Sequence, residues 1–162
     1  MQRLAESLYY EDVEPGRRFE TRAHVVTDQD LERFSDLTHD HHALHRDDAF
    51  ARSMGFPRRI AHGLFGLALM EGLKSELGLY ETSSVASLGW DDVRFRKAIV
   101  SGDRVHARVR LEAKRPSKKE GRGVVTETVE LFDQDGEVAI SATHATLLIT
   151  REAKAPAEPA AT

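Results

Sequence analysis

The most apolar stretch of the chain, residues 61–78, reads AHGLFGLALMEGLKSELG. Its large hydrophobic residues are Leu64, Phe65, Leu67, Leu69, Met70, Leu73 and Leu77. On a helical wheel they cover most sides, whereas a helix on a protein surface carries a single apolar stripe. Residues 61–78 therefore predict one long helix that is buried by the rest of the domain.

The sequence after this helix has the period of β-strands. Between residues 104 and 114 every second side chain is apolar, and those expected to face inward are Val105, Ala107, Val109, Leu111 and Ala113. Further strands are expected at residues 84–98, 123–133 and 137–150, the last two joined by a hairpin turn. We expect four long antiparallel strands in this half of the chain.

The sequence before the helix predicts shorter elements. They are a strand at residues 17–26, a helix starting after Thr27, an ordered polar loop at residues 38–47 and a helix at residues 48–54 capped by Asp47. Residues 1–8 are expected to form an N-terminal arm and residues 151–162 a disordered tail rich in alanine and proline. The folded domain is then expected over residues 9–150.

One sheet and one helix with apolar surface on most sides fit each other in a particular way. The sheet buries its apolar face by wrapping around the helix, which predicts an α+β fold with an antiparallel sheet. A single sheet covers only part of such a helix. We therefore expect a second protomer to cover the rest, in a homodimer or a higher oligomer built from dimers.

The composition excludes several classes of protein. A chain of 162 residues is long enough for one domain of ordinary size. No apolar run approaches the roughly 18 residues of a membrane span, and a net charge of −4 argues against a general nucleic-acid binder. The chain has no cysteine, which excludes disulfides, thiolate nucleophiles and cysteine-bound zinc. A cytoplasmic location is the default expectation.

Five of the eight histidines fall between residues 39 and 62, and they are His39, His41, His42, His45 and His62. Asp40 and His45 lie in the polar loop, and the sequence RIAHG at residues 59–63 opens the long helix. The first N–H groups of a helix have no intrahelical partner and carry partial positive charge. A carboxylate, an imidazole and a helix N-terminus beside an apolar groove are the groups needed to add water to a conjugated thioester.

The histidines could instead hold a metal, because imidazole and carboxylate ligands suit zinc or iron. Alternate positions of a loop point in different directions, however, so we expect no metal site. His39 and His41 are then expected to line the pocket or face solvent. The remaining histidines are expected to be structural or on the surface, and they are His24, His106 and His144.

Four stretches of the chain, in the right order, resemble the MaoC-like, hydratase-2 branch of the hot-dog fold. DHHALH at residues 40–45 and RIAHG at residues 59–63 resemble its motifs D-x-N-P-x-H and R-I-x-H-G. YYEDVEPGRRF at residues 9–19 is similar to its first strand, and VRFRKAIVSGD at residues 93–103 to its F-x-x-P-V-x-x-G-D turn. The resemblance covers about residues 9–150.

The resemblance implies hydration or dehydration of an acyl-CoA thioester, typically trans-2-enoyl-CoA to (R)-3-hydroxyacyl-CoA. It implies that Asp40 and His45 are the catalytic pair, that the Gly63 N–H is the oxyanion donor, and that no cofactor is needed beyond the CoA of the substrate. His42 stands where the family has Asn. The residues expected to contact substrate are His42, His62, Leu64 and Phe65.

Two groups of basic residues are candidates for binding the CoA phosphates. Residues 110–122 carry a local charge of +4 and include Lys118 and Lys119, although a solvated hairpin would have the same composition. Arg94, Arg96 and Lys97 form the second group. Two other functions remain open for the chain, a hot-dog acyl-CoA thioesterase and a non-catalytic acyl-CoA-binding protein.

Overall fold

The computed structural model describes residues 4–154 of the chain. The strands are β1 (Arg18–Glu20), β2 (His24–Val25), β3 (Ser84–Phe95), β4 (Arg104–Pro116), β5 (Arg122–Phe132) and β6 (Val138–Ile149). The helices are α1 (Asp28–Thr38), α2 (Ala43–Arg46), α3 (Asp48–Ser53) and α4 (Gly63–Glu76), with 3-10 helices η1 (Tyr10–Asp12) and η2 (Glu152–Lys154).

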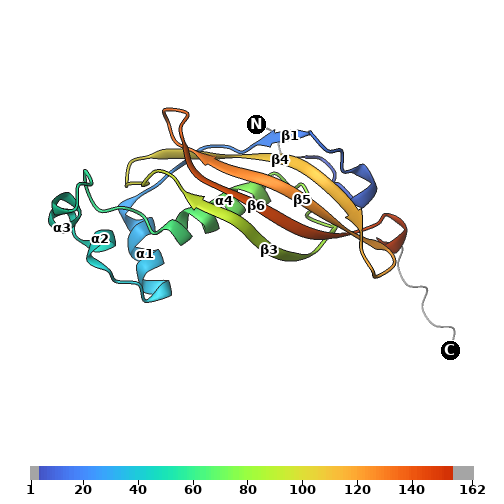
Figure 1. Cartoon of the computed structure of the whole chain (residues 1–162), viewed down its shortest axis with the longest axis horizontal. Helices are drawn as coiled ribbons and strands as arrows, with labels where there is room; N and C mark the ends of the chain where they lie inside the picture. Colours follow the sequence, from blue (N-terminus) through green and yellow to red (C-terminus); the bar gives the residue numbers. More distant parts are fainter. Residues whose placement is uncertain (1–3, 155–162) are drawn as a thin grey trace.

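The main sheet is antiparallel, in the order β1-β4-β5-β6-β3, and β2 pairs with β4. The sheet curves around α4, and α1, α2 and α3 gather at the end where α4 begins (Figure 1). A curved antiparallel sheet wrapped around one long helix is the hot-dog arrangement, so the expected α+β fold is confirmed.

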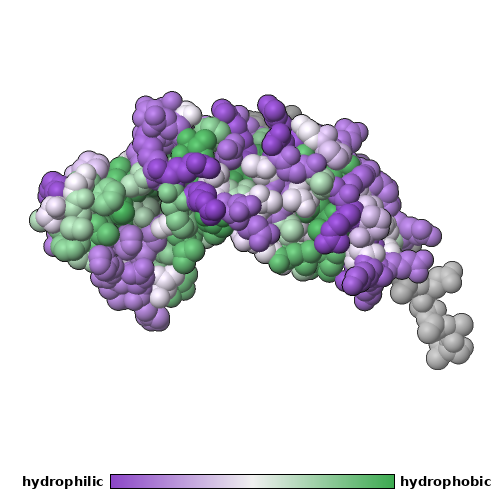
Figure 2. Space-filling model, viewed as in Figure 1, coloured by the Kyte–Doolittle hydropathy of each residue, from purple (hydrophilic) through white to green (hydrophobic). Residues whose placement is uncertain are grey.

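The sheet covers only one side of α4. Gly66, Met70, Leu73 and Lys74 are buried, whereas 63% of the surface of Leu64 is exposed. Figure 2 shows apolar surface over the end of the molecule that carries α3 and along the edge formed by β3. The helix that the sequence predicts as buried on most sides is thus half-covered within one chain.

The alternation predicted for β4 is correct over most of the strand. Val105, Ala107, Val109 and Leu111 are buried. Ala113 was expected to face inward but is exposed, because the register with β5 shifts between Leu111 and Ala113. Such a bulge turns the following side chains to the other face of the sheet.

The single strand expected at residues 17–26 is wrong. The chain forms β1 and β2 instead, separated at Thr21. The Thr21 hydroxyl accepts the Ala107 N–H at 2.9 Å, while the Thr21 N–H donates to the Ala107 carbonyl at 2.9 Å. The side chain takes the hydrogen bond that a backbone carbonyl would accept in a continuous ladder, which interrupts the strand.

Residues 38–47 are not entirely loop, as the sequence predicted, because they contain α2. His42 caps this single turn of helix, its Nδ1 accepting the Leu44 N–H at 3.2 Å. The expected cap of α3 is confirmed, since Asp47 Oδ1 accepts the N–H groups of Ala49 and Phe50. Side-chain caps of this kind allow short helices to form where the apolar period is weak.

An ionic cluster lies inside the core between α4 and the sheet. Lys74 is 4% exposed, and its Nζ donates to Glu127 Oε2 at 2.9 Å and to His144 Nδ1 at 2.8 Å. Lys74 also pairs with Glu71 at 2.9 Å. Because His144 Nδ1 accepts from Lys74, His144 carries its proton on Nε2, which lies 2.7 Å from the Ser87 hydroxyl. His144 is therefore a buried structural residue.

The two ends of the described chain pack against the domain. Leu4 and Leu8 donate backbone hydrogen bonds to Leu77 and Leu79, just after α4. Arg151 pairs with Asp12 at 2.7 Å, so ordered structure continues past residue 150 into η2. The rest of the expected tail, residues 155–162, lies outside the described residues. Over residues 4–154 no helix has the length and apolarity needed to cross a membrane.

Candidate active site

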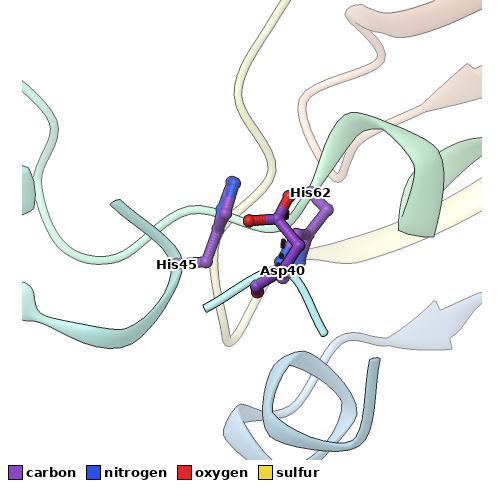
Figure 3. Close-up of side chains that lie close together, drawn as sticks. All are labelled: Asp40, His45 and His62. Atoms are coloured by element: carbon purple, nitrogen blue, oxygen red, sulfur yellow. Dashed lines mark hydrogen bonds and ion pairs between the residues drawn. The ribbon is translucent and has the colours of Figure 1, made fainter. Parts of the chain in front are cut away.

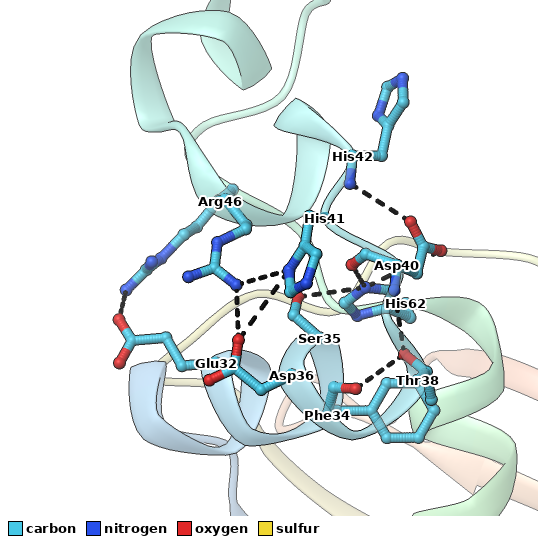
Figure 4. A network of polar contacts seen from close by, with 11 residues as sticks. Glu32, Phe34, Ser35, Asp36, Thr38, Asp40, His41, His42, Arg46 and His62 are labelled. Carbon is cyan, nitrogen blue, oxygen red and sulfur yellow. Dashed lines mark hydrogen bonds and ion pairs between the residues drawn. The ribbon is translucent and has the colours of Figure 1, made fainter.

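Asp40 follows directly from the end of α1. The helix ends at His39, whose φ of 61° is left-handed and turns the chain back toward α4. Asp40 Oδ1 accepts the His42 N–H at 3.2 Å, and the Asp40 carbonyl accepts a hydrogen bond from His62 at 3.0 Å (Figure 4). These contacts hold the backbone of Asp40 while leaving its carboxylate half-exposed.

His45 projects from α2 toward the start of α4. Its Nδ1 lies 2.8 Å from the Ile60 carbonyl, and since a carbonyl can only accept, Nδ1 carries the proton. The other nitrogen, Nε2, makes no hydrogen bond within residues 4–154 and is free to accept a proton. Burial lowers the pKa of His45, and the neighbouring His62 and His42 lower it further. His45 is therefore suited to act as a base in its neutral form.

Gly63 is the first residue of α4, so its N–H has no partner within the helix. The ring of Phe95 packs directly over this glycine: a Cβ at residue 63 would lie 2.8 Å from the ring. A larger residue at position 63 would therefore have to displace the Phe95 ring, which is 53% exposed. The N–H at the start of the 14-residue helix α4 can stabilise a developing negative charge.

The structure brings Asp40, His45 and the start of α4 together, as the sequence predicts. The ligand-capable atoms of Asp40, His45 and His62 lie within 4.8 Å of one another (Figure 3). Asp40 comes from the turn after α1, His45 from α2 and His62 from the residue before α4. Three segments separated in sequence thus meet at one point.

The same three residues could be considered as metal ligands, but their geometry fits a metal poorly. The rings of His45 and His62 are stacked, with centroids 3.7 Å apart and planes at 26°. Stacked imidazoles do not direct their nitrogens at one central point. His45 Nδ1 and His62 Nε2 are in addition engaged with backbone carbonyls. The absence of a metal from the mechanism stays a prediction.

A cavity of about 430 Å³ opens beside this group. His45, His62 and Gly63 border it on one side. The remainder of its wall is mostly apolar and is formed by Phe56, Ile60, Ala61, Leu64, Phe95, Arg96, Lys97, Ala98, Ile99 and Ile140. A mostly apolar cavity with a few polar groups at one end is suited to a small organic ligand.

The residues expected to contact substrate are placed differently from one another. Leu64 lines the cavity, as does His62, which is almost fully buried. Phe65 is not among the lining residues, because its ring packs edge-on against Phe34 of α1, with centroids 5.6 Å apart. The prediction of a substrate contact for Phe65 is therefore not supported, and its role is to pack α4 against α1.

His42 also lies outside the cavity lining. Its Nδ1 caps α2, and its ring stands edge-on to Phe50 at 5.9 Å and to His45 at 6.3 Å. Because Nδ1 accepts a hydrogen bond, the neutral ring carries its proton on Nε2 and can donate from it. His42 can thus supply a donor near His45, as an Asn amide would.

Of the two remaining clustered histidines, His41 lies in a surface network. Arg46 Nη1 donates to His41 Nδ1 and to Asp36, each at 2.8 Å (Figure 4). His39 is exposed at the end of α1. Neither His39 nor His41 belongs to the group of side chains formed by Asp40, His45 and His62.

The basic candidates for CoA binding separate into distinct positions. Arg96 and Lys97 line the cavity. Arg94 is exposed, and its guanidinium donates to the Val93 carbonyl and pairs with Asp92. The positive charge of Lys97 is already balanced by two carboxylates, because its Nζ donates hydrogen bonds to Asp133 at 2.5 Å and Glu137 at 2.6 Å. These bonds raise the pKa of Lys97. An added phosphate would meet two carboxylates at that point.

Lys118 and Lys119 lie in the turn between β4 and β5. This turn contacts the end of β6, where the Thr150 N–H donates to the Gly121 carbonyl at 2.9 Å. The cavity is at the other end of β6, beside Ile140. Within one protomer these two lysines are therefore separated from the cavity by the length of the sheet, which argues against the predicted contact with CoA.

The sequence did not predict two residues, Ser35 and Arg59, that fix the position of the segment before α4 relative to α1. Ser35 is fully buried in α1, with its hydroxyl 3.3 Å from His62 Nε2. Arg59 pairs with Asp28 at 3.1 Å and Glu32 at 3.2 Å, which ties the segment before α4 to α1. No local pattern marks these contacts, although Arg59 belongs to the RIAHG motif.

Comparison with known proteins identifies the family of the chain. Residues 11–131, most of the chain, match the family described as MaoC like domain. The chain therefore belongs to the MaoC-like family, a family of hydratases and dehydratases with the hot-dog fold.

Among its relatives, protein MaoC from Klebsiella aerogenes is 31% identical over 114 residues, which is 70% of this chain and 33% of that protein. The chain thus corresponds to about a third of the length of that relative. The (R)-specific enoyl-CoA hydratase of Aeromonas caviae is 32% identical over 67% of this chain and 75% of its own. The MaoC-like dehydratase from Rhodospirillum rubrum superposes with a TM-score of 0.80 at 26% identity, covering 90% of this chain and 99% of its own.

Proposed function

We propose that this protein adds water to, or removes it from, the 2,3 double bond of an acyl-CoA thioester. The reaction would be that of an (R)-specific enoyl-CoA hydratase or of the reverse 3-hydroxyacyl-CoA dehydratase. The observation that carries the proposal is that Asp40 lies close to His45, whose Nε2 is free, and that His45 and the first residue of α4 line an apolar cavity, although Asp40 itself is not in its wall.

In the hydration direction, Asp40 and His45 hold a water molecule between them. His45 Nε2 takes a proton from this water while its oxygen forms a bond to C3 of the enoyl thioester. The electron pair of the double bond moves onto the thioester oxygen, and the Gly63 N–H stabilises the enolate. A proton from the acid–base pair then bonds to C2, which collapses the enolate and restores the thioester.

The cavity accounts for the rest of the substrate. The acyl chain would lie along the wall formed by Leu64, Ile99 and Ile140, where burial of its methylene groups favours binding. Arg96 is then the best-placed cation for a CoA phosphate, because it borders the cavity and its guanidinium, among residues 4–154, is hydrogen-bonded to the neutral Ser141 hydroxyl and to no carboxylate.

We also propose a homodimer, or a higher oligomer built from dimers. β3 is one of the two edge strands of the sheet, and its side chains Val85, Leu88 and Phe95 are exposed together with Leu64 of α4. An unpaired strand edge beside apolar surface favours pairing with another chain. A second copy whose β3 lay antiparallel to the first would cover this edge and extend the sheet.

One assay distinguishes this function from its two alternatives. The purified protein is incubated with a series of trans-2-enoyl-CoA thioesters, starting with crotonyl-CoA, while enoyl absorbance and free thiol are measured together. Loss of enoyl absorbance without thiol release, with (R)-3-hydroxyacyl-CoA as product, is the expected result. Thiol release identifies a thioesterase instead. Tight binding without turnover of any thioester identifies a non-catalytic acyl-CoA-binding protein.

The other sequence expectations remain predictions. They are that no cofactor is required beyond the CoA of the substrate, that the protein binds neither nucleic acid nor membrane, and that it is cytoplasmic.

A further inference from the structure

His62 is a buried imidazole to which the proposed reaction gives no step. It is 4% exposed and precedes the first residue of α4, yet its side chain makes no capping hydrogen bond to that helix. The ring instead fills the space between α1 and the catalytic pair, with the Phe34 ring 5.1 Å away. The contacts of this ring with Asp40 and His45 indicate the role of His62.

The first contact is with Asp40. His62 Nε2 lies 3.0 Å from the Asp40 carbonyl and 3.3 Å from the Ser35 hydroxyl. A carbonyl oxygen can only accept, so Nε2 carries the proton and donates it there. This hydrogen bond fixes the backbone from which the Asp40 carboxylate projects.

The second contact is with His45. The two rings are stacked with centroids 3.7 Å apart and planes at 26°. The stack restricts rotation of the His45 ring, while the bond from His45 Nδ1 to the Ile60 carbonyl fixes its tautomer. His62 is thus in contact with both members of the pair.

Its own nitrogens are unsuited to a chemical step. Nε2 is engaged as a donor, and Nδ1 is buried without a hydrogen-bond partner among the described residues. Where His62 borders the cavity, it does so with 96% of its surface covered, which leaves little for a substrate to touch.

We propose that His62 is a positioning residue, which holds the Asp40 backbone through its Nε2–H and the His45 ring through the stack. This inference rests on the proposed function for its kinetic consequences, but the geometry that it describes exists without turnover. It replaces the direct substrate contact that the sequence predicted for His62.

Two substitutions separate the two contacts. His62→Phe keeps an aromatic ring for the stack and removes the donor, whereas His62→Gln keeps a donor and removes the ring. His41→Ala serves as the matched control, because it removes an exposed histidine next to Asp40 in the sequence whose side chain lies outside the site. Thermal unfolding and circular dichroism check that each variant is folded.

Both His62 variants are expected to lower kcat by about tenfold to a hundredfold with KM changed by less than about threefold, because small displacements of reacting groups have effects of this size. His41→Ala is expected to keep native kinetics. A higher KM at unchanged kcat would overturn the proposal in favour of substrate binding. Loss of activity to the level of His45→Ala in both variants would make His62 a catalytic residue, and native kcat in both would leave it without a role.

A second readout does not depend on turnover. The charged and titratable groups that face His45 are His62, His42 and Asp40, and of these His62 and His42 lower the pKa of His45. Replacement of His62 by phenylalanine removes one lowering influence and keeps the burial. Titration of the His45 imidazole by nuclear magnetic resonance should therefore give a higher pKa in His62→Phe than in the native protein.

An unchanged His45 titration in His62→Phe, together with unchanged His45 ring signals in His62→Gln, where the stacked ring is missing, would refute the positioning role even if the enzyme is active. A native protein that hydrates no enoyl thioester would refute the proposed function, while a shifted His45 titration in the variant would still support the positioning role. For a His62→Phe variant that does not fold, the same two measurements are made on His62→Gln, where unchanged values have the same refuting meaning.

Discussion

Replacement of Lys74 by methionine removes the cation from the ionic cluster between α4 and the sheet. In the native protein Lys74 Nζ lies 2.9 Å from Glu127 and 2.8 Å from His144, which are 0% and 1% exposed. Methionine has a similar length and no charge, so the substitution leaves Glu127 buried without its cation, with His144 Nδ1 at 3.4 Å still beside the carboxylate. His144 Nδ1 keeps the Thr146 hydroxyl at 3.1 Å as a donor.

Breaking one partner of a buried ion pair typically lowers the free energy of unfolding by about 3–5 kcal/mol. For a domain of this size each kcal/mol lowers Tm by roughly 2–4 °C, so Tm should fall by about 6–20 °C. Replacing both members of a pair with apolar residues is often neutral. The double variant Lys74→Met/Glu127→Leu should therefore recover most of the loss.

Urea unfolding at pH 7 and equal protomer concentration measures these differences, because unfolding of an oligomer depends on concentration. Lys118→Met is the matched control, since it makes the same change at an exposed lysine and should alter stability by less than about 0.5 kcal/mol. A Lys74→Met variant within 1 kcal/mol of native would refute the reasoning. So would a double variant that is no more stable than the single one.

Three further predictions concern the site. Because burial lowers the pKa of His45 below the usual histidine value of about 6.5 and the neutral imidazole is the base, kcat/KM should stay constant as the pH is lowered to about 6.5 and fall only at lower pH; an acid limb above pH 7 in the pH profile would contradict this. Gly63→Ala places a methyl group 2.8 Å from the half-exposed Phe95 ring, so kcat/KM should fall at least about tenfold at nearly native Tm, with partial recovery in Gly63→Ala/Phe95→Ala; native kcat/KM in the single variant would contradict the inference that the packing of Phe95 on Gly63 sets the geometry at the start of α4. Dialysis against EDTA should leave the rate unchanged, since the chemistry assigned to Asp40 and His45 needs no metal; a loss restored by zinc or iron would overturn that assignment.

The parts of the structure that the sequence predicts correctly are those fixed by local chemistry. Thr27 and Asp47 cap their helices with their own side chains, so the starts of α1 and α3 can be predicted from neighbouring residues. The alternation of β4 up to Leu111 likewise depends only on which face is apolar. The meeting of Asp40 with His45 was predicted from a motif as well as from local chemistry.

The parts that were missed depend on contacts between distant segments. The break at Thr21 exists because its hydroxyl meets Ala107, 86 residues away along the chain. The Phe65 side chain lies outside the cavity because its ring packs edge-on against the ring of Phe34. No neighbouring residue in the sequence indicates that Lys74 is buried. It is buried because β5 and β6 place Glu127 and His144 beside it. Such pairings follow from the three-dimensional arrangement and have no local signal.

The central claim, that Asp40 and His45 activate water for addition to an enoyl thioester, is tested most directly by the kcat of Asp40→Asn and His45→Ala with the best enoyl-CoA substrate. Both changes leave the hydrophobic core intact, because Asp40 is exposed and the half-buried His45 lies on a short helix outside that core. General acid–base catalysis contributes about 10²- to 10⁴-fold, so each variant should lose at least a hundredfold in kcat while keeping a native circular dichroism spectrum. Near-native kcat in both folded variants would contradict the account.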